Sequence, residues 1–263
     1  MAIFFFYYII FLVIIMFTDT HCHIYEEYYD VDDIMKKINS SNVNRIINNA
    51  CDFKTSLEVL DLSKRYSNMH CAIGLHPEND LDEIDNVMAL IIKNKDNPKM
   101  VAIGEIGLDY YYNKDNKEEQ IEVLCKQLEL AGKLNLPVII HSREATGDML
   151  SILKKYDVKG VIHCFNGSVE VAKEYIKLGY KLGINGVITF KNCKLIEVIK
   201  TIGVDNVVFE TDSPYLAPVP FRGEENNPTH VIDIVDFVSN NTGVSVEDLA
   251  NISNKNIKDI FDI

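Results

Sequence analysis

Runs of apolar, β-branched residues alternate with amphipathic stretches along most of the chain. The apolar runs predict strands near residues 13–19, 43–49, 69–74, 100–104, 136–141, 159–164, 180–184 and 206–211. Between them, apolar positions recur at helical spacing, for example over 118–134, 148–156 and 169–178. The predicted strands are apolar throughout, which is typical of parallel strands covered on both faces. Eight strand–helix alternations therefore predict an α/β fold, a (β/α)8 TIM barrel with an eight-stranded parallel sheet.

The first residues differ from the rest, because positions 1–17 carry no charge at all. A signal peptide would have a basic leading segment and small residues at a cleavage site, and a membrane span would need about 20 residues. We therefore interpret residues 1–15 as an apolar extension that arises from a start-site error, with synthesis truly beginning at Met16. An uncleaved membrane anchor is the alternative, and membrane contact is expected only if the extension is real. Residues 16–263 are expected to form one domain, since no linker or repeat interrupts them.

Composition narrows the class of protein. The net charge is −13, from 39 acidic and 26 basic residues, which argues against a protein that coats DNA through a basic surface. It does not exclude a nuclease, because divalent ions would supply positive charge where a phosphate binds. The six cysteines show no paired spacing, which favours reduced thiols and a cytoplasmic location over disulfides.

Side chains of the metal-ligand type stand at the ends of several predicted strands. They are His21, His23, Glu105, His141, His163 and Asp212. The carboxyl ends of barrel strands meet at one rim, so these side chains are expected to converge there. His21 and His23 are two residues apart on a strand and point to the same face, so both can reach one ion. Imidazoles and carboxylates are the ligands that a hydrolytic divalent-metal site requires.

Six ordered segments identify a family. They are DTHCH at 19–23, GLHP at 74–77, AIGEIGLDY at 102–110, LPVIIHSREA at 136–145, HCFNG at 163–167 and ETDSPYL at 210–216. Through them the chain resembles the TatD family of metal-dependent deoxyribonucleases, within the amidohydrolase-like barrels. The resemblance covers essentially all of residues 16–263.

The resemblance implies a site for two metal ions. By analogy, one ion would be held by His21, His23 and Asp212, the other by His141 and His163, with Glu105 between the two. Two such ions can activate a water and stabilise both the attacked phosphate and the departing oxygen. Asp212 could take the proton from that nucleophile, and with Glu105 it forms the predicted catalytic pair. The donor set admits Mg²⁺, Mn²⁺ or Zn²⁺.

One segment departs from the family pattern. After the last strand, members usually carry Arg-Gly, then basic residues, then Asn-Glu-Pro. Here residues 222–228 read RGEENNP, so Glu224 and Glu225 replace the bases and Asn227 replaces the usual glutamate. The predicted ligands are untouched, but acidic side chains beside the site would repel backbone phosphates and weaken polynucleotide affinity.

Further residues near the motifs have two interpretations each. His76 could contact a substrate phosphate or pair with a rim carboxylate, and Arg143 could bind phosphate or form a rim salt bridge. Glu210 could orient a ligand histidine from behind or pair with a basic side chain. The tyrosines at 110–112 could stack on a base or pack within their loop.

The sequence thus predicts a metal-dependent hydrolase, a deoxyribonuclease that cleaves phosphodiester bonds of single-stranded DNA or DNA ends. The alternative is an amide, ester or lactone hydrolase, or an aminoacyl-tRNA deacylase, because the same activated water can attack a carbonyl. A third hypothesis is a membrane-tethered barrel that only binds metal or a partner. No stable protein partner is implied.

Overall fold

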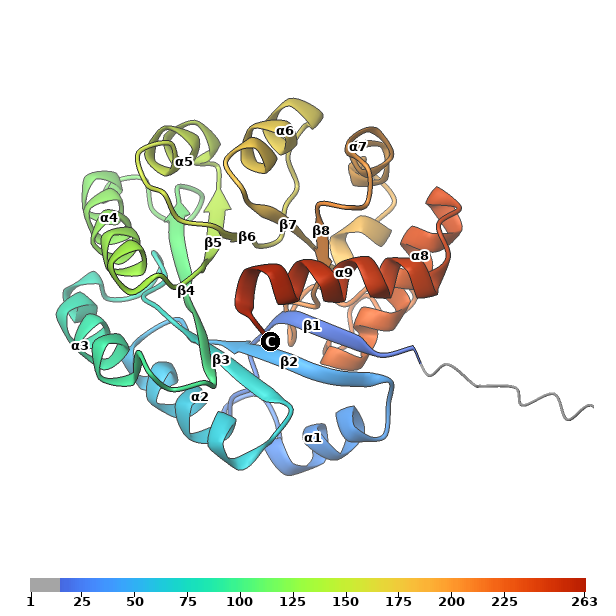
Figure 1. Cartoon of the computed structure of the whole chain (residues 1–263), viewed down its shortest axis with the longest axis horizontal. Coiled ribbons are helices and arrows are strands. Elements are labelled where there is room, and N and C mark those ends of the chain that lie inside the picture. The colour runs from blue at the N-terminus through green and yellow to red at the C-terminus, as the bar shows by residue number, and fades with distance from the viewer. Residues whose placement is uncertain (1–14) are drawn as a thin grey trace, which may run out of the picture.

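The computed structural model describes residues 15–263, in which eight parallel strands follow one another in chain order around a barrel (Figure 1). The strands are β1 (Phe17–Cys22), β2 (Val43–Asn49), β3 (Met69–Ile73), β4 (Met100–Asp109), β5 (Val138–Arg143), β6 (Gly160–Ile162), β7 (Lys181–Ile184) and β8 (Val207–Phe209). Each strand pairs in parallel with the next, from β1–β2 to β7–β8. The predicted TIM barrel is confirmed.

The helices surround the strands on the outside of the barrel, except for the last, which crosses one of its ends (Figure 1). They are α1 (Val31–Asn39), α2 (Phe53–Arg65), α3 (Ile84–Asn94), α4 (Lys117–Leu134), α5 (Thr146–Leu153), α6 (Val169–Lys177), α7 (Leu195–Ile202), α8 (Val231–Thr242) and α9 (Val246–Phe261), with short 3-10 turns η1 (Leu81–Glu83), η2 (Gly186–Thr189) and η3 (Pro228–His230). Helices α1, α2, α6 and α9 each begin at a side chain that caps the first turn. Asp52, for example, accepts the backbone N–H of Thr55 at 2.7 Å and caps α2.

Most strands differ from the sequence-based boundaries at one or both ends, and three of the differences affect candidate ligands. The first strand is predicted over 13–19, but β1 runs over Phe17–Cys22, so His21 lies inside the strand. β4 continues to Asp109 instead of ending near residue 104, which places Glu105 in the middle of the strand. β8 ends at Phe209, three residues before Asp212. In β1 and β4, the polar ligand-type residues obscured the strand ends, because apolar runs end where such side chains begin.

The barrel closes between its last and first strands at the carboxyl end. The N–H of Asp212 donates to the carbonyl of His21 at 2.8 Å, and the N–H of His23 donates to the carbonyl of Ser213 at 2.7 Å. Buried Asp19 fastens the same seam, because its carboxylate accepts the backbone N–H of Thr211 at 2.9 Å and the Thr211 hydroxyl at 2.5 Å. Closure therefore brings the first and the last of the predicted ligand segments side by side.

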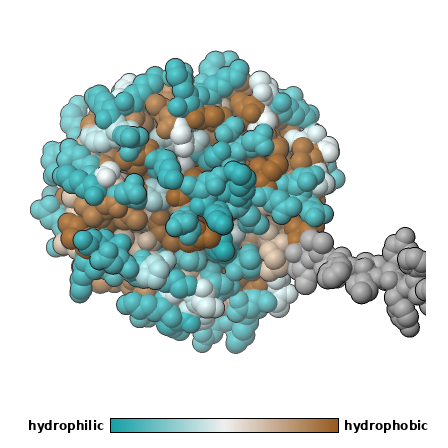
Figure 2. Space-filling model, in the orientation of Figure 1, coloured by the Kyte–Doolittle hydropathy of each residue, from teal (hydrophilic) through white to brown (hydrophobic). Residues whose placement is uncertain are grey.

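The opposite end of the barrel is covered by α9, which crosses the face turned toward the viewer in Figure 1. Its Ile257, Ile260 and Phe261 join an inner core with strand residues such as Ile47 and Val208. A larger core cluster fills the space between the strands and the outer helices. On the face that α9 crosses, hydrophilic residues are interspersed with apolar ones (Figure 2). With this end covered, the loops after the strands form the mouth of the barrel.

Within residues 15–263, no helix combines the length and apolar character that crossing a bilayer requires. The predicted extension lies outside the described residues except for Ile15, and its interpretation stays a prediction. All six cysteines fall in the described part of the chain, and each is a free thiol there.

Candidate metal centre

The six predicted ligand residues converge at the mouth of the barrel from five different strands or strand ends. Glu105 lies at the centre of the group. Its Oε2 atom is 3.2 Å from Nε2 of His21 and 3.7 Å from Nε2 of His23. Its Oε1 atom is 3.1 Å from Nδ1 of His141 and 3.9 Å from Nε2 of His163. The two oxygens of one carboxylate thus face two different pairs of histidines.

Asp212 lies on the side of His21 and His23. Its Oδ1 atom is 3.4 Å from Nε2 of His23, 3.8 Å from Nε2 of His21 and 3.6 Å from Nε2 of His163. This proximity follows from the β8–β1 seam, where the Asp212 backbone is hydrogen-bonded to His21. Asp212 has a φ of 58°, an unusual backbone conformation for a residue other than glycine, in keeping with a functional position.

The outer nitrogens of three histidines are held by oxygen acceptors. Nδ1 of His23 lies 3.0 Å from the Asn49 carbonyl and 2.9 Å from the Tyr25 hydroxyl, which itself donates to that carbonyl. Nδ1 of His163 lies 2.8 Å from Oε1 of Glu210. Nε2 of His141 lies 2.9 Å from Oδ2 of Asp109. A carbonyl or a carboxylate only accepts, so each of these nitrogens carries the proton.

In the neutral form of these three histidines, the other ring nitrogen therefore presents a lone pair to the centre of the group. Lone pairs would then face the carboxylate oxygens of Glu105 and Asp212, which also only accept hydrogen bonds. Such an arrangement is stabilised by a cation between them, and histidine ligands of metals are held from behind in this way. The donor chemistry therefore fits a divalent metal ion.

The spacing of the inner atoms agrees with that fit. Ligands about 2.1 Å from one ion lie about 3.0–3.4 Å apart in octahedral or tetrahedral geometry. Nε2 of His21 lies 3.1 Å from Nε2 of His23, within this range. Two sets of three suitable atoms share Glu105, one with His21 and His23, the other with His141 and His163. A third set joins Asp212 to His21 and His163, and a fourth joins His76 and Glu78 to His141.

The carboxylates and imidazoles of the group shift one another's pKa values. Burial opposes ionisation of Glu105, but the imidazoles of His21, His76 and His163 hold its pKa well below the usual range. Burial would likewise lower the pKa of His163, yet the carboxylates of Glu210, Asp212 and Glu105 raise it to about 9. In the absence of an ion, protons thus provide part of the positive charge that these carboxylates require.

Glycines allow the close approach of the strands that carry these side chains. A Cβ atom on Gly107 would lie 1.9 Å from the carbonyl oxygen of His141, its partner across the β4–β5 ladder. A Cβ atom on Gly183 would lie 2.2 Å from Oε2 of Glu210. Side chains at these two positions would therefore displace groups next to the candidate ligands.

The structure also shows the surroundings of three residues for which the sequence allowed two roles each. His76 is buried, with Nε2 3.6 Å from Oε1 of Glu105, and its Nδ1 accepts the backbone N–H of Glu78 at 3.3 Å. Glu210 is fully buried behind His163 and accepts the N–H of Cys164 at 2.7 Å. Arg143 is exposed, with its guanidinium 3.9 Å from the ring centre of Tyr111.

Two functional candidates were missed by sequence reasoning. Asp109 is buried against His141, and Asp19 is buried at the seam behind His21, where burial raises its pKa to about 8. Both stand inside recognised motifs. Spacing could have found them: Asp109 is four residues after Glu105 on β4, and Asp19 two before His21 on β1, so each shares a strand face with a ligand.

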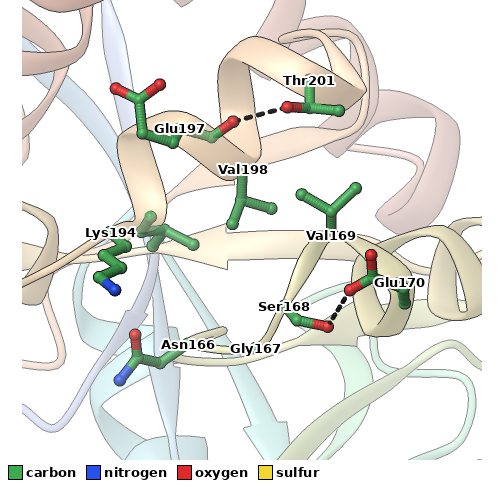
Figure 3. Close-up of a pocket in the computed structure, with 10 residues that line it drawn as sticks. Asn166, Gly167, Ser168, Val169, Glu170, Lys194, Glu197, Val198 and Thr201 are labelled. Atoms are coloured by element: carbon green, nitrogen blue, oxygen red, sulfur yellow. Dashed lines mark hydrogen bonds between the residues drawn. The ribbon is translucent and has the colours of Figure 1, made fainter.

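Away from the candidate metal centre, a pocket of about 420 Å³ lies between the loop before α6 and helix α7 (Figure 3). Its lining includes Asn166, Ser168 and Lys194, and Figure 3 shows the Ser168 hydroxyl hydrogen-bonded to the Glu170 carboxylate. None of the six predicted ligands lines it. It is separate from the candidate metal centre.

Known proteins are similar to this chain in sequence and in fold. Residues 18–262 match the family model described as TatD related DNase. The metal-dependent hydrolase YabD of Bacillus subtilis, whose name gives no substrate, is 39% identical over 254 residues, covering 94% of this chain and 100% of that protein. A mouse protein named as a proposed deoxyribonuclease is 30% identical over 262 residues, covering 92% of this chain and 87% of that protein. The crystal structure of YjjV, a TatD homologue from Escherichia coli, superposes with a TM-score of 0.86 at 29% identity, covering 95% of this chain and 99% of that one.

Proposed function

The chain belongs to the TatD family of metal-dependent hydrolases, and from this premise we propose that it cleaves phosphodiester bonds of DNA, on single strands or at ends. One observation carries the hydrolytic part of the proposal. Three histidines are held from behind by Asn49, Asp109 and Glu210, so that their inner nitrogens face carboxylate oxygens. That arrangement suits catalysis by divalent ions.

The proposed metal ligands are His21, His23, Glu105, His141, His163 and Asp212, with Glu105 shared between two ions. When bound, two divalent ions would supply an activated water and stabilise charge on the attacked phosphate. The nitrogen and oxygen donors suit Mg²⁺, Mn²⁺ or Zn²⁺. Glu210 is the proposed positioning residue for His163, because it holds Nδ1 at 2.8 Å.

Asp212 is the proposed acceptor of the proton released by the attacking water. Its side chain is 13% exposed at the mouth, whereas that of Glu105 is 4% exposed and enclosed by histidines. Surrounding imidazoles, His163 foremost, lower the pKa of Asp212 against the effect of burial, so it is ionised and able to accept. An ionised carboxylate at the edge of the site meets the geometric requirement for a general base.

His76 is proposed to donate a hydrogen bond to the substrate phosphate. Its Nδ1 accepts the N–H of Glu78, so Nε2 carries the proton and points toward the centre of the site. Burial lowers the pKa of His76 to about 3, so the ring remains a neutral donor. Arg143 is proposed to contact the DNA backbone from the rim, where its guanidinium is exposed.

The acidic surface favours weak contacts with the DNA backbone. Glu224 and Glu225 are exposed in the loop after β8. We therefore propose short single strands or ends as substrates, because they need fewer backbone contacts than a long duplex. We also keep the cytoplasm as the proposed location, since the cysteines are free thiols.

The test is cleavage of a labelled single-stranded oligonucleotide by the full chain with Mg²⁺ or Mn²⁺. We expect products that require the added metal and that fall by at least about 1000-fold in Glu105→Ala and in Asp212→Asn. Metal content of each purified variant separates loss of the ions from loss of the base. Activity that survives both substitutions contradicts the assigned mechanism.

A panel of acyl substrates completes the test, with esters, lactones and an aminoacyl-tRNA. If the protein hydrolyses acyl substrates and leaves DNA uncleaved, the same site belongs to an amide or ester hydrolase. If it cleaves DNA and leaves the acyl substrates intact, the result supports the proposal.

A further inference from the structure

A pocket of about 300 Å³ adjoins the candidate metal centre, between the loops that follow β3 and β4. We propose that it binds one nucleobase of the DNA strand, next to the phosphate that is attacked. This inference rests on the proposed deoxyribonuclease function and deepens it. The volume is at the lower end of the range for small-molecule sites. Asp109 lines the pocket and lies 2.9 Å from His141, so an occupant would touch the edge of the metal centre.

The lining chemistry selects the occupant. The polar groups that line the pocket are Glu78, Asn79, Asp109, Asn113, Asn116 and Gln120, together with the Tyr112 phenol. No lysine or arginine is among the described residues that line it. The exposed carboxylate of Glu78 would repel a phosphate, whereas it can accept a hydrogen bond from the exocyclic amino group of a base. Gln120 is already bonded to Asp109 and Asn116. The Nδ2 groups of Asn113 and Asn116 and the Oδ1 atom of Asn79 have no hydrogen-bond partner among the described residues, so they can donate to or accept from a base edge. A flat, uncharged, hydrogen-bonding group fits this lining.

Aromatic side chains stand open at the rim of this pocket. Tyr111 is 52% exposed and Tyr112 is 63% exposed, whereas the preceding Tyr110 is buried, with its hydroxyl 2.9 Å from Asp148. The Arg143 guanidinium lies 3.9 Å from the ring centre of Tyr111 and 4.9 Å from that of Tyr112. Exposed rings beside a guanidinium are typical of surfaces on which unpaired bases stack.

Asp109 connects these tyrosines to the metal centre. Its Oδ1 atom accepts the backbone N–H of Tyr111 at 2.8 Å and that of Tyr112 at 3.0 Å. Its Oδ2 atom contacts His141. One buried carboxylate therefore fixes both the turn at residues 110–112, here called the tyrosine turn, and a proposed metal ligand. A base stacked on Tyr112 would be held at a fixed distance from the reacting phosphate.

The experiment measures binding of single-stranded DNA, by fluorescence anisotropy with Mn²⁺, to an Asp212→Asn protein whose metal content has first been shown to equal that of the unsubstituted protein. A series of oligonucleotides carries one abasic nucleotide at successive positions around a non-hydrolysable phosphorothioate link. We expect about tenfold weaker binding when the abasic nucleotide occupies one position beside the link. Adding Tyr112→Ala should weaken binding of the intact strand to the same degree and remove the sensitivity to that abasic nucleotide.

Two further variants separate stacking from general effects. Tyr112→Phe keeps the ring and should retain binding within about twofold. Tyr66→Ala removes another tyrosine that has an arginine over its ring, Arg65 at 5.4 Å, at the far end of α2. Because that end of α2 leads into β3, it lies on the opposite face of the barrel from the mouth. This variant should leave DNA binding unchanged.

The outcomes distinguish this inference from the function on which it rests. If the unsubstituted protein cleaves no DNA with Mg²⁺ or Mn²⁺, the proposed function fails, and the base site fails with it. If it cleaves DNA but the abasic series shows no position dependence, or Tyr112→Ala keeps that dependence, only the base site is overturned. Loss of position dependence in Tyr112→Ala, with wild-type behaviour of Tyr66→Ala, supports the site.

Discussion

Glu210 lies behind His163, with Oε1 2.8 Å from Nδ1 of the imidazole. The same oxygen accepts the N–H of Cys164 at 2.7 Å, and the residue is fully buried. A buried carboxylate in this position fixes the orientation of the ring and the nitrogen that carries the proton.

Replacement of Glu210 should therefore weaken metal binding without unfolding the protein. In Glu210→Gln, the amide oxygen can still accept the N–H groups of His163 and Cys164, but the negative charge that supports the imidazole is lost. The amide nitrogen then takes the place of Oε2, which is buried with no described hydrogen-bond partner. We expect a loss of about 10- to 100-fold in metal affinity and in hydrolysis. Isothermal titration with Mn²⁺ measures the first, and oligonucleotide cleavage the second.

Gly183→Ala should reproduce part of this effect, because its Cβ would lie 2.2 Å from Oε2 of Glu210. The matched control is Glu174→Gln, which breaks an exposed ion pair with Lys154 on the outer surface. That control should retain metal affinity, since exposed pairs contribute little. Unchanged metal affinity in Glu210→Gln would contradict the positioning role.

Asp109 should act on His141 in the same manner. In Asp109→Asn, Oδ1 can still accept the two backbone N–H groups of the tyrosine turn, but the amide nitrogen now faces Nε2 of His141. The proton is then expected to move to Nδ1, which faces Glu105. We predict hydrolysis about 10- to 100-fold slower at nearly unchanged thermal stability.

Asp109→Ala provides the comparison, because it removes the turn contacts as well. It should lower both hydrolysis and DNA binding, whereas Asp109→Asn should lower hydrolysis alone. If the two variants bind DNA equally well, the contacts between this carboxylate and the turn do not contribute to DNA binding.

Stability should respond oppositely to alanine at two glycines. Gly107→Ala places a methyl group 1.9 Å from the His141 carbonyl across the β4–β5 ladder, so the strands must separate. We expect a loss of at least about 2 kcal/mol in the free energy of unfolding. Gly147 lies in α5, and a methyl group added there would have no described heavy atom beyond its own helix turn within 4 Å, so Gly147→Ala should stabilise by about 0.5–1 kcal/mol. Urea denaturation measures both, and similar effects at the two sites would disprove the steric argument.

His70 on β3 gives a pH dependence that does not involve the metal centre. Burial, with Lys99 and Arg45 nearby, lowers its pKa from 6.5 to about 4. The unfolded chain therefore binds a proton that the folded chain does not bind between pH 6.5 and 4. The contribution of His70 to stability is present above pH 6.5 and is lost as the pH falls toward 4. His70→Gln should reduce the slope of unfolding free energy against pH in this window only, as measured by urea denaturation at several pH values.

Local sequence determined the elements and the types of side chain. Apolar β-branched runs predicted the strands because a strand covered on both faces must be apolar, and the strand count predicted a barrel. The rule that barrel strands end at one rim was enough to gather the six ligand-type residues, since it depends on chain direction alone. Strand ends were less accurate, because polar residues inside β1 and β4 interrupt the apolar runs and look like strand ends.

Tertiary structure decided how those side chains are held. The pairs Glu210 with His163 and Asp109 with His141 join different strands, and the contacts depend on strand register and rotamers that no local pattern encodes. The seam between β8 and β1 places Asp212 against His21, although the two residues lie near opposite ends of the chain. The same holds for the tyrosine turn, where only the fold separates buried Tyr110 from exposed Tyr111 and Tyr112. The sequence determines which side chains are present, but long-range packing determines their protonation, their exposure and their hydrogen-bond partners.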